Sequence, residues 1–403
     1  MKEVVHASPG GPSVLTGLVT VSLVILFLVV FLRRLNQPYF IAYILSGIIL
    51  GPQALGLLTN PDLIAQLGEL GIILLLFFIG LEIRLPDLTK HVRKPLQGML
   101  LQGLLSALAV WGVGTYLGWN LPVRVLITCT LSLSSSAIIM PYLKQHGEMH
   151  TPLGTLTTGV LLLQDVAAIP MILLLNFMGK GHLSALEISL MSAGGVLVAL
   201  FLRLAMRHES LRFPFADEIA RDHDLQVFVG LLVCFGMAWL THTFRLSAGL
   251  GAFVAGIIIN RSGSTNWLEH SLLPFRVFFL ALFFVAIGLQ IDLRFFSQNW
   301  LLVSTLVLLV LLINSLLGAL AFRAAGTSWR DSFYAGALLS QLGEFSIVLA
   351  LTARQLDLIS PFFYQLTLAV VALTMLVTTL YIELIRGVLF RPEQREPTRL
   401  TSP

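Results

Sequence analysis

The chain has 403 residues, of which 56% are hydrophobic and 11% are charged, and its formal net charge is +4. Soluble domains carry about 25% charged residues, so this composition excludes an ordinary soluble globular domain. The two cysteines, Cys129 and Cys234, lie in apolar stretches without metal-ligand spacing, which argues against a disulfide framework or a metal site built on cysteine.

Long apolar stretches follow one another along the chain, and a membrane-spanning helix needs about 20 such residues. They predict an all-α membrane protein with about 13 transmembrane helices and short loops. The predicted spans are residues 13–32, 39–57, 62–83, 95–118, 121–143, 152–178, 183–206, 224–243, 246–260, 271–291, 300–322, 330–355 and 361–389. The first span lacks a cleavage site before Arg33 and Arg34, so we expect a retained helix rather than a signal peptide. We expect residues 1–390 to form one transmembrane domain and residues 391–403 a short cytoplasmic tail.

The basic residues are distributed unevenly between the two sides of the predicted membrane. With the N-terminus outside, eighteen of the 25 Lys and Arg residues fall on the cytoplasmic side, six fall outside and Arg276 lies within a span. The positive-inside rule therefore places the N-terminus outside and the C-terminus in the cytoplasm. The positive charge is thus explained by topology, and we expect no nucleic-acid partner.

Three short segments recur at a nearly constant distance in the sequence. Ile79-Gly80-Leu81-Glu82-Ile83 resembles residues 287–291, residues 47–50 resemble 256–259, and residues 75–78 resemble 281–284. The shift equals seven helices, an odd number, so the two halves would cross the membrane in opposite senses. Inverted repeats of this kind are typical of secondary transporters. The predicted organisation is a first repeat over 13–178, a connector helix over 183–206 and a second repeat over 224–389.

Two spans carry polar segments at matched positions of the repeats, residues 131–138 and 339–346. The first contains Ser134, Ser135 and Ser136, and the second contains Gln341, Gly343 and Glu344. Such residues weaken helices, and irregular backbone at membrane depth survives only where it is buried in protein or lines a cavity. We predict a broken helix at each place, near the binding site. Close packing of helices through small residues is the alternative for the serines.

Asp165 lies in the middle of the sixth span, and it follows Gln164. A carboxylate at that depth is costly, so it is expected to face a polar cavity and to function there, unless it only ties two helices together. Asp165 could bind either a proton or an alkali cation such as K⁺ or Na⁺, and alternating access would then exchange one for the other. Gln164 does not titrate, so one proton per cation and electroneutral exchange are expected, without a cofactor.

Other polar residues in the spans have simpler interpretations. Glu69 and Arg276 occupy nearly equivalent repeat positions, where we expect a structural ion pair with each other or with the broken segments. Glu344 is expected to neutralise a helix end at its break. Residues 144–150 contain two histidines that could sense pH, but a solvated loop is the expectation.

The motifs together resemble the membrane domain of Kef-type potassium/proton antiporters, in the second monovalent cation:proton antiporter family. The residues that carry this resemblance are Gly47–Pro52, Glu69–Glu82, Leu133–Ala137, Gln164–Pro170, Leu250–Gly256, Pro274–Arg276 and Gln341–Phe345. The resemblance implies a homodimer in a bacterial inner membrane, in which a core of crossed broken helices moves against a dimerisation domain. It implies Asp165 as the proton and cation site, with Gln164 and Ser134 to Ser136 nearby.

The chain departs from the Kef pattern in two respects. No nucleotide-binding motif follows the last span, so nucleotide regulation would need a separate cytoplasmic subunit. Where the family shows a Lys after Pro-Phe, this chain has Arg276, which keeps its charge. Four alternatives remain open at the sequence level. They are a Na⁺/H⁺ antiporter, a gated K⁺ efflux system with channel-like flux, a sodium-coupled carrier of organic solutes, and a membrane-embedded enzyme, for which no catalytic cluster is evident.

Overall fold

The computed structural model describes residues 14–34, 39–58, 61–82, 93–179, 221–244, 248–261 and 265–390, with single positions and short stretches between 186 and 201 and residue 246. In these ranges the regular structure is entirely helical. In the part of the chain that the structure describes, six helices are long and apolar enough to cross a membrane, and five shorter apolar helices accompany them. The predicted all-α membrane fold is confirmed. The connector predicted at 183–206 falls largely outside the described residues, as does the tail at 391–403.

The chain divides into two compact units, each built from two separate stretches. The first unit comprises residues 1–85 and 181–298, and the second comprises residues 86–180 and 299–403. Each unit therefore takes helices from both of the predicted repeats. The first unit contains α1 (Val14–Arg34), α2 (Tyr39–Leu50), α3 (Pro61–Glu82), α11 (His223–Thr243), α12 (Ala248–Arg261), α13 (Thr265–Gln290) and α14 (Leu293–Gln298).

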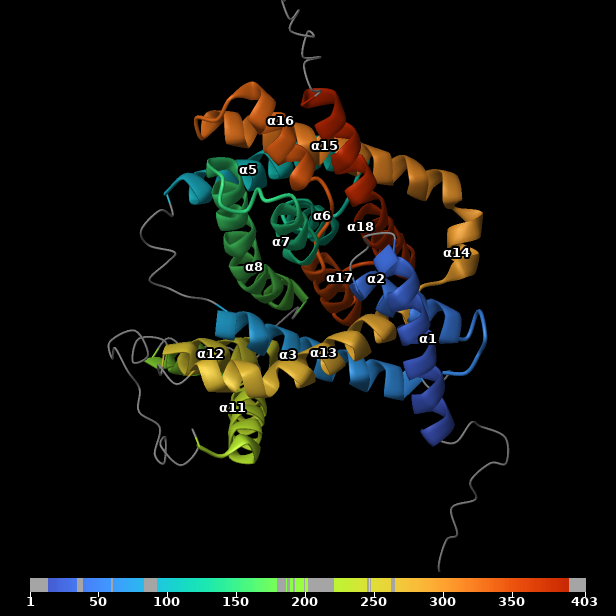
Figure 1. Ribbon diagram of the computed structural model, residues 1–403, viewed down its shortest axis with the longest axis vertical. Coiled ribbons are helices and arrows are strands. Elements are labelled where there is room, and N and C mark those ends of the chain that lie inside the picture. Colours follow the sequence, from blue (N-terminus) through green and yellow to red (C-terminus); the bar gives the residue numbers. More distant parts are fainter. Residues whose placement is uncertain are drawn as a thin grey trace, which may run out of the picture. The chain divides into compact units, whose positions relative to one another are not determined.

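Two close helix crossings organise the first unit, α2 on α13 and α3 on α12 (Figure 1). A Cβ placed on Gly47 of α2 would lie 2.8 Å from the Cα of Gly288 in α13. A Cβ placed on Gly256 of α12 would likewise lie 2.8 Å from the Cα of Gly80 in α3. Small residues let two backbones approach in this way, which is how helices associate in membranes.

The glycine contacts follow the offset read from the sequence. Gly47 corresponds to Gly256 and Gly80 corresponds to Gly288, so the first crossing maps onto the second when the repeats are exchanged. Two helix pairs with equivalent sequences thus pack through equivalent atoms. This correspondence is what an inverted repeat requires of the first unit.

The second unit contains a central group of short helices and a set of longer ones. Its helices are α5 (Arg93–Tyr116), α6 (Leu121–Leu131), α7 (Ser136–Gln145), α8 (Pro152–Gly179), α15 (Trp300–Ala324), α16 (Trp329–Leu338), α17 (Phe345–Gln355) and α18 (Pro361–Leu389). In Figure 1 the short helices α6, α7 and α17 lie inside this unit, among α5, α8, α15, α16 and α18.

Local sequence signals explain where several of these helices begin. Asn120 caps α6 by accepting a hydrogen bond from the N–H of Val123, with Pro122 in the first turn. Ser328 and Ser360 cap α16 and α18 in the same manner. Such caps satisfy N–H groups that have no partner within the helix. Each helix start is therefore set by residues adjacent to it in the sequence.

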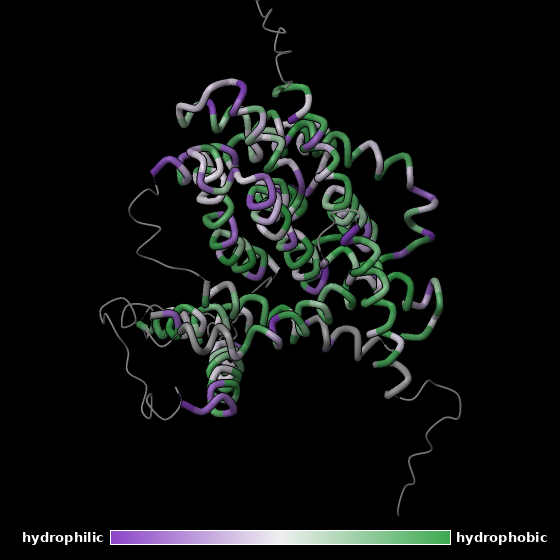
Figure 2. Tube along the Cα trace, in the orientation of Figure 1, coloured by the Kyte–Doolittle hydropathy of each residue, from purple (hydrophilic) through white to green (hydrophobic). Residues whose placement is uncertain are grey.

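Helix α5 has its small and polar residues inside and its leucines outside. Its buried stripe includes Gln102 and Ser106, whereas Leu100, Leu104 and Leu108 are exposed. A surface helix in water shows the reverse pattern, so the surroundings of α5 are apolar. Hydrophobic residues dominate the long helices, and hydrophilic ones gather at positions such as the start of α11 (Figure 2). These features are those of an integral membrane protein.

Candidate ion site at the crossing of two broken helices

Both predicted helix breaks are present in the second unit. Helix α6 ends at Leu131 and α7 begins at Ser136, while α16 ends at Leu338 and α17 begins at Phe345. Before the first break, the hydroxyl of Ser132 donates to the carbonyl of Thr128 at 2.7 Å. Such back-bonding competes with the helical ladder, as the serine-rich sequence predicted.

The two breaks contact each other directly. The N–H of Gly343 donates to the carbonyl of Leu133 at 2.8 Å, and the hydroxyl of Ser134 donates to the carbonyl of Leu339 at 2.8 Å. A Cβ on Gly343 would lie 2.7 Å from the carbonyl oxygen of Ser134, so glycine is required for this approach. The breaks thus satisfy part of each other's backbone hydrogen bonding, which irregular backbone at this depth needs.

Gln164 joins helix α8 to the first break. Its side chain is 1% exposed, and its Oε1 accepts a hydrogen bond from the N–H of Ser134 at 3.0 Å. Asp165 is the next residue of the same helix and is half-buried. Gln164 and Ser134, which the sequence analysis placed in one site, are therefore in contact.

The remaining predicted site residues are also in this unit. Ser135 is fully buried, Ser136 is partly buried, and Gln341 is fully buried with no hydrogen-bond partner for its side-chain amide among the described residues. Glu344 is 8% exposed and occupies the N-cap position of α17, yet its side chain makes no capping hydrogen bond. Hydrogen-bond capping of α17 by Glu344 is thus not observed, because its backbone already has helical angles, φ −58° and ψ −31°.

Two buried amides that the sequence analysis missed support the breaks. Asn314 of α15 is fully buried, and its Nδ2 donates to the carbonyl of Ser340 at 3.2 Å. Gln102 of α5 is fully buried, and its Oε1 accepts from the Nε2 of Gln164 at 3.1 Å. Gln102 is a single polar residue between leucines and a glycine, and Asn314 lies with Ser315 in an apolar run. That position was the only sequence signal, and it does not reveal the partner.

Glu69 and Arg276 lie in the first unit, on α3 and α13. Glu69 is exposed, and the guanidinium carbon of Arg276 lies 5.9 Å from the centre of the Phe78 ring. Cation–π geometry of this kind adds to the interactions of a partly buried arginine. The structural ion pair predicted for the two residues stays a prediction.

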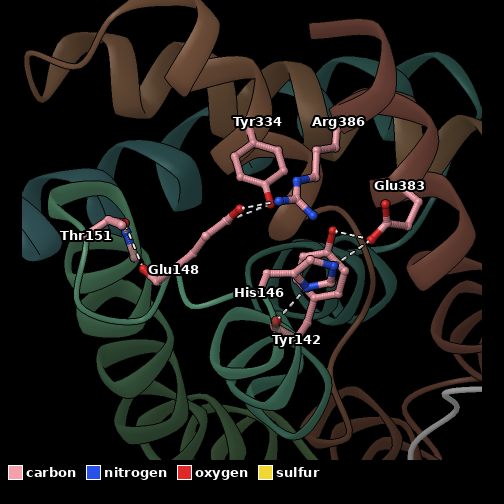
Figure 3. A network of polar contacts seen from close by, with 8 residues as sticks. Tyr142, His146, Glu148, Thr151, Tyr334, Glu383 and Arg386 are labelled. Carbon is pink, nitrogen blue, oxygen red and sulfur yellow. Dashed lines mark hydrogen bonds and ion pairs between the residues drawn. The ribbon is translucent and has the colours of Figure 1, made fainter. Parts of the chain in front are cut away.

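A polar network occupies one end of the second unit (Figure 3). The Nε2 of His146 lies 3.0 Å from a carboxylate oxygen of Glu383, and the hydroxyl of Tyr142 donates to the same oxygen at 2.8 Å. Arg386 and Tyr334 both contact the carboxylate of Glu148, at 3.0 and 2.8 Å. The expectation of a solvated loop at residues 144–150 is therefore wrong for His146 and Glu148. The sequence could not show that α16 and α18 supply partners for them.

The candidate donors include two carboxylates, that of Glu344 in the second break and that of Asp165, which follows Gln164 on α8, together with hydroxyl, amide and backbone oxygens. Hard oxygen ligands of this kind suit alkali cations. Within the described ranges, no group of three His, Cys, Asp or Glu residues could hold a metal ion together. The two cysteines are buried and unpaired with each other, as apolar core residues are.

Crossed broken helices beside a membrane-embedded aspartate define a class, the secondary-active cation transporters of the antiporter fold. The fold of the chain is similar to that of the sodium proton antiporter MjNhaP1 from Methanocaldococcus jannaschii, with a TM-score of 0.65 over 93% of this chain and 98% of that one. The two sequences are 14% identical, so this likeness concerns the fold alone.

Sequence comparison identifies the family. Residues 19–385 match the transmembrane sodium/hydrogen exchanger family, and the chain belongs to this family. It is 34% identical over 352 residues to the iron transporter MagA of Paramagnetospirillum magneticum, covering 87% of this chain and 81% of MagA. It is 32% identical over 356 residues to the glutathione-regulated potassium-efflux system protein KefC of Shigella sonnei, covering 86% of this chain and 56% of KefC. The resemblance to Kef-type antiporters is confirmed, although the chain spans little more than half the length of KefC.

Proposed function

We propose that the protein is a monovalent cation:proton antiporter that exchanges K⁺ for H⁺ by alternating access. The observation that carries the proposal is that Asp165 directly follows Gln164 on α8, and that Gln164 accepts a hydrogen bond from the N–H of Ser134 in the first helix break. An ionisable group at this depth marks an ion pathway. The amide beside it does not titrate, so Asp165 is the titrating member of the pair.

Exchange follows from competition at one carboxylate. A proton on Asp165 removes the negative charge that a cation needs, and a bound cation stabilises the ionised form against protonation. If the empty ionised site does not cross, the protein carries either ion but not both. One elementary charge is then moved in each direction, so the exchange is electroneutral.

The choice of K⁺ rests on the relatives. KefC is named as a potassium-efflux system, and it is far more similar in sequence to this chain than MjNhaP1 is. Na⁺ uses the same oxygen ligands, so Na⁺/H⁺ exchange is the first alternative. Channel-like K⁺ efflux is the second, and it predicts cation flux that persists without a proton gradient.

Iron transport is a further candidate because MagA carries that name. The candidate site contains no imidazole, a common ligand of iron, and no group of three His, Cys, Asp or Glu among the described residues could hold a metal ion, so a monovalent cation suits it better. Fe²⁺ is therefore included as a substrate in the test.

Proteoliposomes containing a fluorescent pH indicator test the proposal. A pH gradient is imposed, and K⁺, Na⁺, Li⁺ or Fe²⁺ is added outside. We expect K⁺-dependent proton movement that is unaffected by clamping the membrane potential, and its loss in Asp165→Asn. Asp357→Asn is the matched control, since the Asp357 side chain is 88% exposed and makes only a local pair with Arg354. If Asp165→Asn retains K⁺-dependent proton movement, Asp165 is not the ion site. If only Fe²⁺ causes proton movement, K⁺ is not the substrate.

The same proposal includes the assembly and its orientation. We propose a homodimer in a bacterial inner membrane, with the N-terminus outside and the C-terminus in the cytoplasm, as the distribution of basic residues predicts. Chemical cross-linking in native membranes tests the dimer, and labelling of single cysteines introduced near each terminus tests the orientation.

A further inference from the structure

The hydrogen bonds around Gln164 have a direction that the structure fixes. A backbone N–H can only donate, so the atom of Gln164 that faces the N–H of Ser134 must be the oxygen. The distance is 3.0 Å, and both groups are buried. The Nε2 of Gln164 must therefore point away from the break.

Gln102 provides the acceptor for the Nε2 of Gln164. The Nε2 of Gln164 donates to the Oε1 of Gln102 at 3.1 Å. The chain of bonds thus runs from the backbone of the first break, through α8, to α5. The Ser134 end selects this orientation of the Gln164 amide, because turning it over would place two donors against each other there, and Gln102 must then present its oxygen to the Nε2 of Gln164.

Gln102 takes part in this series of hydrogen bonds only through its Oε1, which accepts from Gln164. Gln102 is 0% exposed, and its Nε2 has no hydrogen-bond partner among the described residues. A buried donor without a partner costs free energy, so the hydrogen bonds of Gln102 itself do not account for a glutamine at this position. Its neighbours in the buried stripe of α5 are Gly98 and Ser106, one turn away on either side, and both are small.

We propose that Gln102 is a positioning residue of the ion site, which holds the amide of Gln164 so that Gln164 can hold the first helix break beside Asp165. The role of Gln102 as part of an ion site rests on the proposed antiporter function. Without the acceptor oxygen, the Gln164 amide can leave Ser134, and the unwound segment loses a bond that fixes its place. The expected consequence is weaker cation binding rather than a change in the chemistry at Asp165.

Three variants separate this role from general packing. Gln102→Met keeps the length of the side chain and removes the acceptor. Gln102→Glu keeps an acceptor oxygen and, in the neutral form that full burial favours, replaces the unused amide donor by a hydroxyl. Ser106→Ala removes another fully buried polar group one turn further along α5, whose hydroxyl has no hydrogen-bond partner among the described residues, and serves as the control.

Two measurements are made on each variant. The first is the half-saturating K⁺ concentration and the maximal rate of proton exchange in proteoliposomes. The second is amide hydrogen exchange of a peptide covering residues 132–136. We expect Gln102→Met to raise the half-saturating concentration by roughly two- to tenfold, the worth of one hydrogen bond, with a smaller effect on the maximal rate. Amide hydrogen exchange of the peptide 132–136 should be faster in Gln102→Met than in wild type. In Gln102→Glu and Ser106→Ala, neither the half-saturating K⁺ concentration nor the rate of amide hydrogen exchange should rise above the wild-type value.

The proposal is overturned if Gln102→Met matches wild type in both measurements, or if Gln102→Glu or Ser106→Ala has the same effect as Gln102→Met. If Gln102→Met does not fold, Gln102→Asn is used in its place, because its shorter side chain withdraws the oxygen from Gln164. A wild-type protein without cation-dependent proton movement overturns the antiporter function instead. Hydrogen exchange at the break still tests the positioning role in that case.

Discussion

Adding one methyl group at a glycine crossing should separate two helices of the first unit. In Gly256→Ala the new Cβ would lie 2.8 Å from the Cα of Gly80, and still closer to the carbonyl oxygen of Phe77. Ordinary contact begins at 3.4 Å. The obstructing atoms belong to the backbone, so α3 and α12 must move apart along their whole crossing.

The size of the effect follows from comparison with an open glycine. Overpacking of this kind costs about 1–3 kcal/mol. Gly236 lies in α11 of the same unit, and a Cβ there meets nothing within 4 Å. Gly236→Ala should therefore be neutral or stabilising by up to about 1 kcal/mol, since alanine is the better helix former. We expect the free energies of unfolding of the two variants to differ by about 1–4 kcal/mol.

The assay is reversible unfolding in detergent micelles by titration with dodecyl sulfate, followed by circular dichroism. Gly47→Ala tests the repeat relation, because Gly47 is the repeat equivalent of Gly256 and a Cβ there would likewise lie 2.8 Å from a glycine Cα, that of Gly288, so it should cost as much as Gly256→Ala. If Gly256→Ala and Gly236→Ala have free energies of unfolding within about 0.5 kcal/mol of each other, the argument from close backbone approach is refuted.

Three further outcomes are expected. Asn314→Leu removes the donor to the carbonyl of Ser340 and should lower the free energy of unfolding by about 1–3 kcal/mol in the same titration, whereas an unchanged value contradicts a structural role. Glu383→Gln breaks a pair with His146 that is 22% and 46% exposed, so stability should change by less than about 1 kcal/mol. Hydrogen exchange at the end of α18 should nevertheless become faster. If protons and cations compete at Asp165 as proposed, each unit of increase in pH should lower the half-saturating K⁺ concentration by up to about tenfold while protons occupy most sites, and a pH-independent value is incompatible with competition.

The sequence by itself determined the membrane class, the positions of the apolar helices among the described residues, and the two helix breaks. These features depend on residues close together in the chain. A run of apolar residues specifies a span, and clustered serines or a glycine beside a glutamate weaken the helix in which they lie. The recurrence of Gly47 as Gly256 was also readable, because a repeat requires only two similar segments at a fixed offset.

Tertiary structure alone decided which polar groups meet. Gln102 and Gln164 are 62 positions apart, and Ser134 and Leu339 are 205 positions apart. His146, expected in a solvated loop, contacts Glu383 of the last helix. Hydropathy describes how each residue partitions between water and lipid, but it contains no information on which helix face meets which. That choice is made by packing and by the need of every buried donor and acceptor for a partner, which only the folded chain can satisfy.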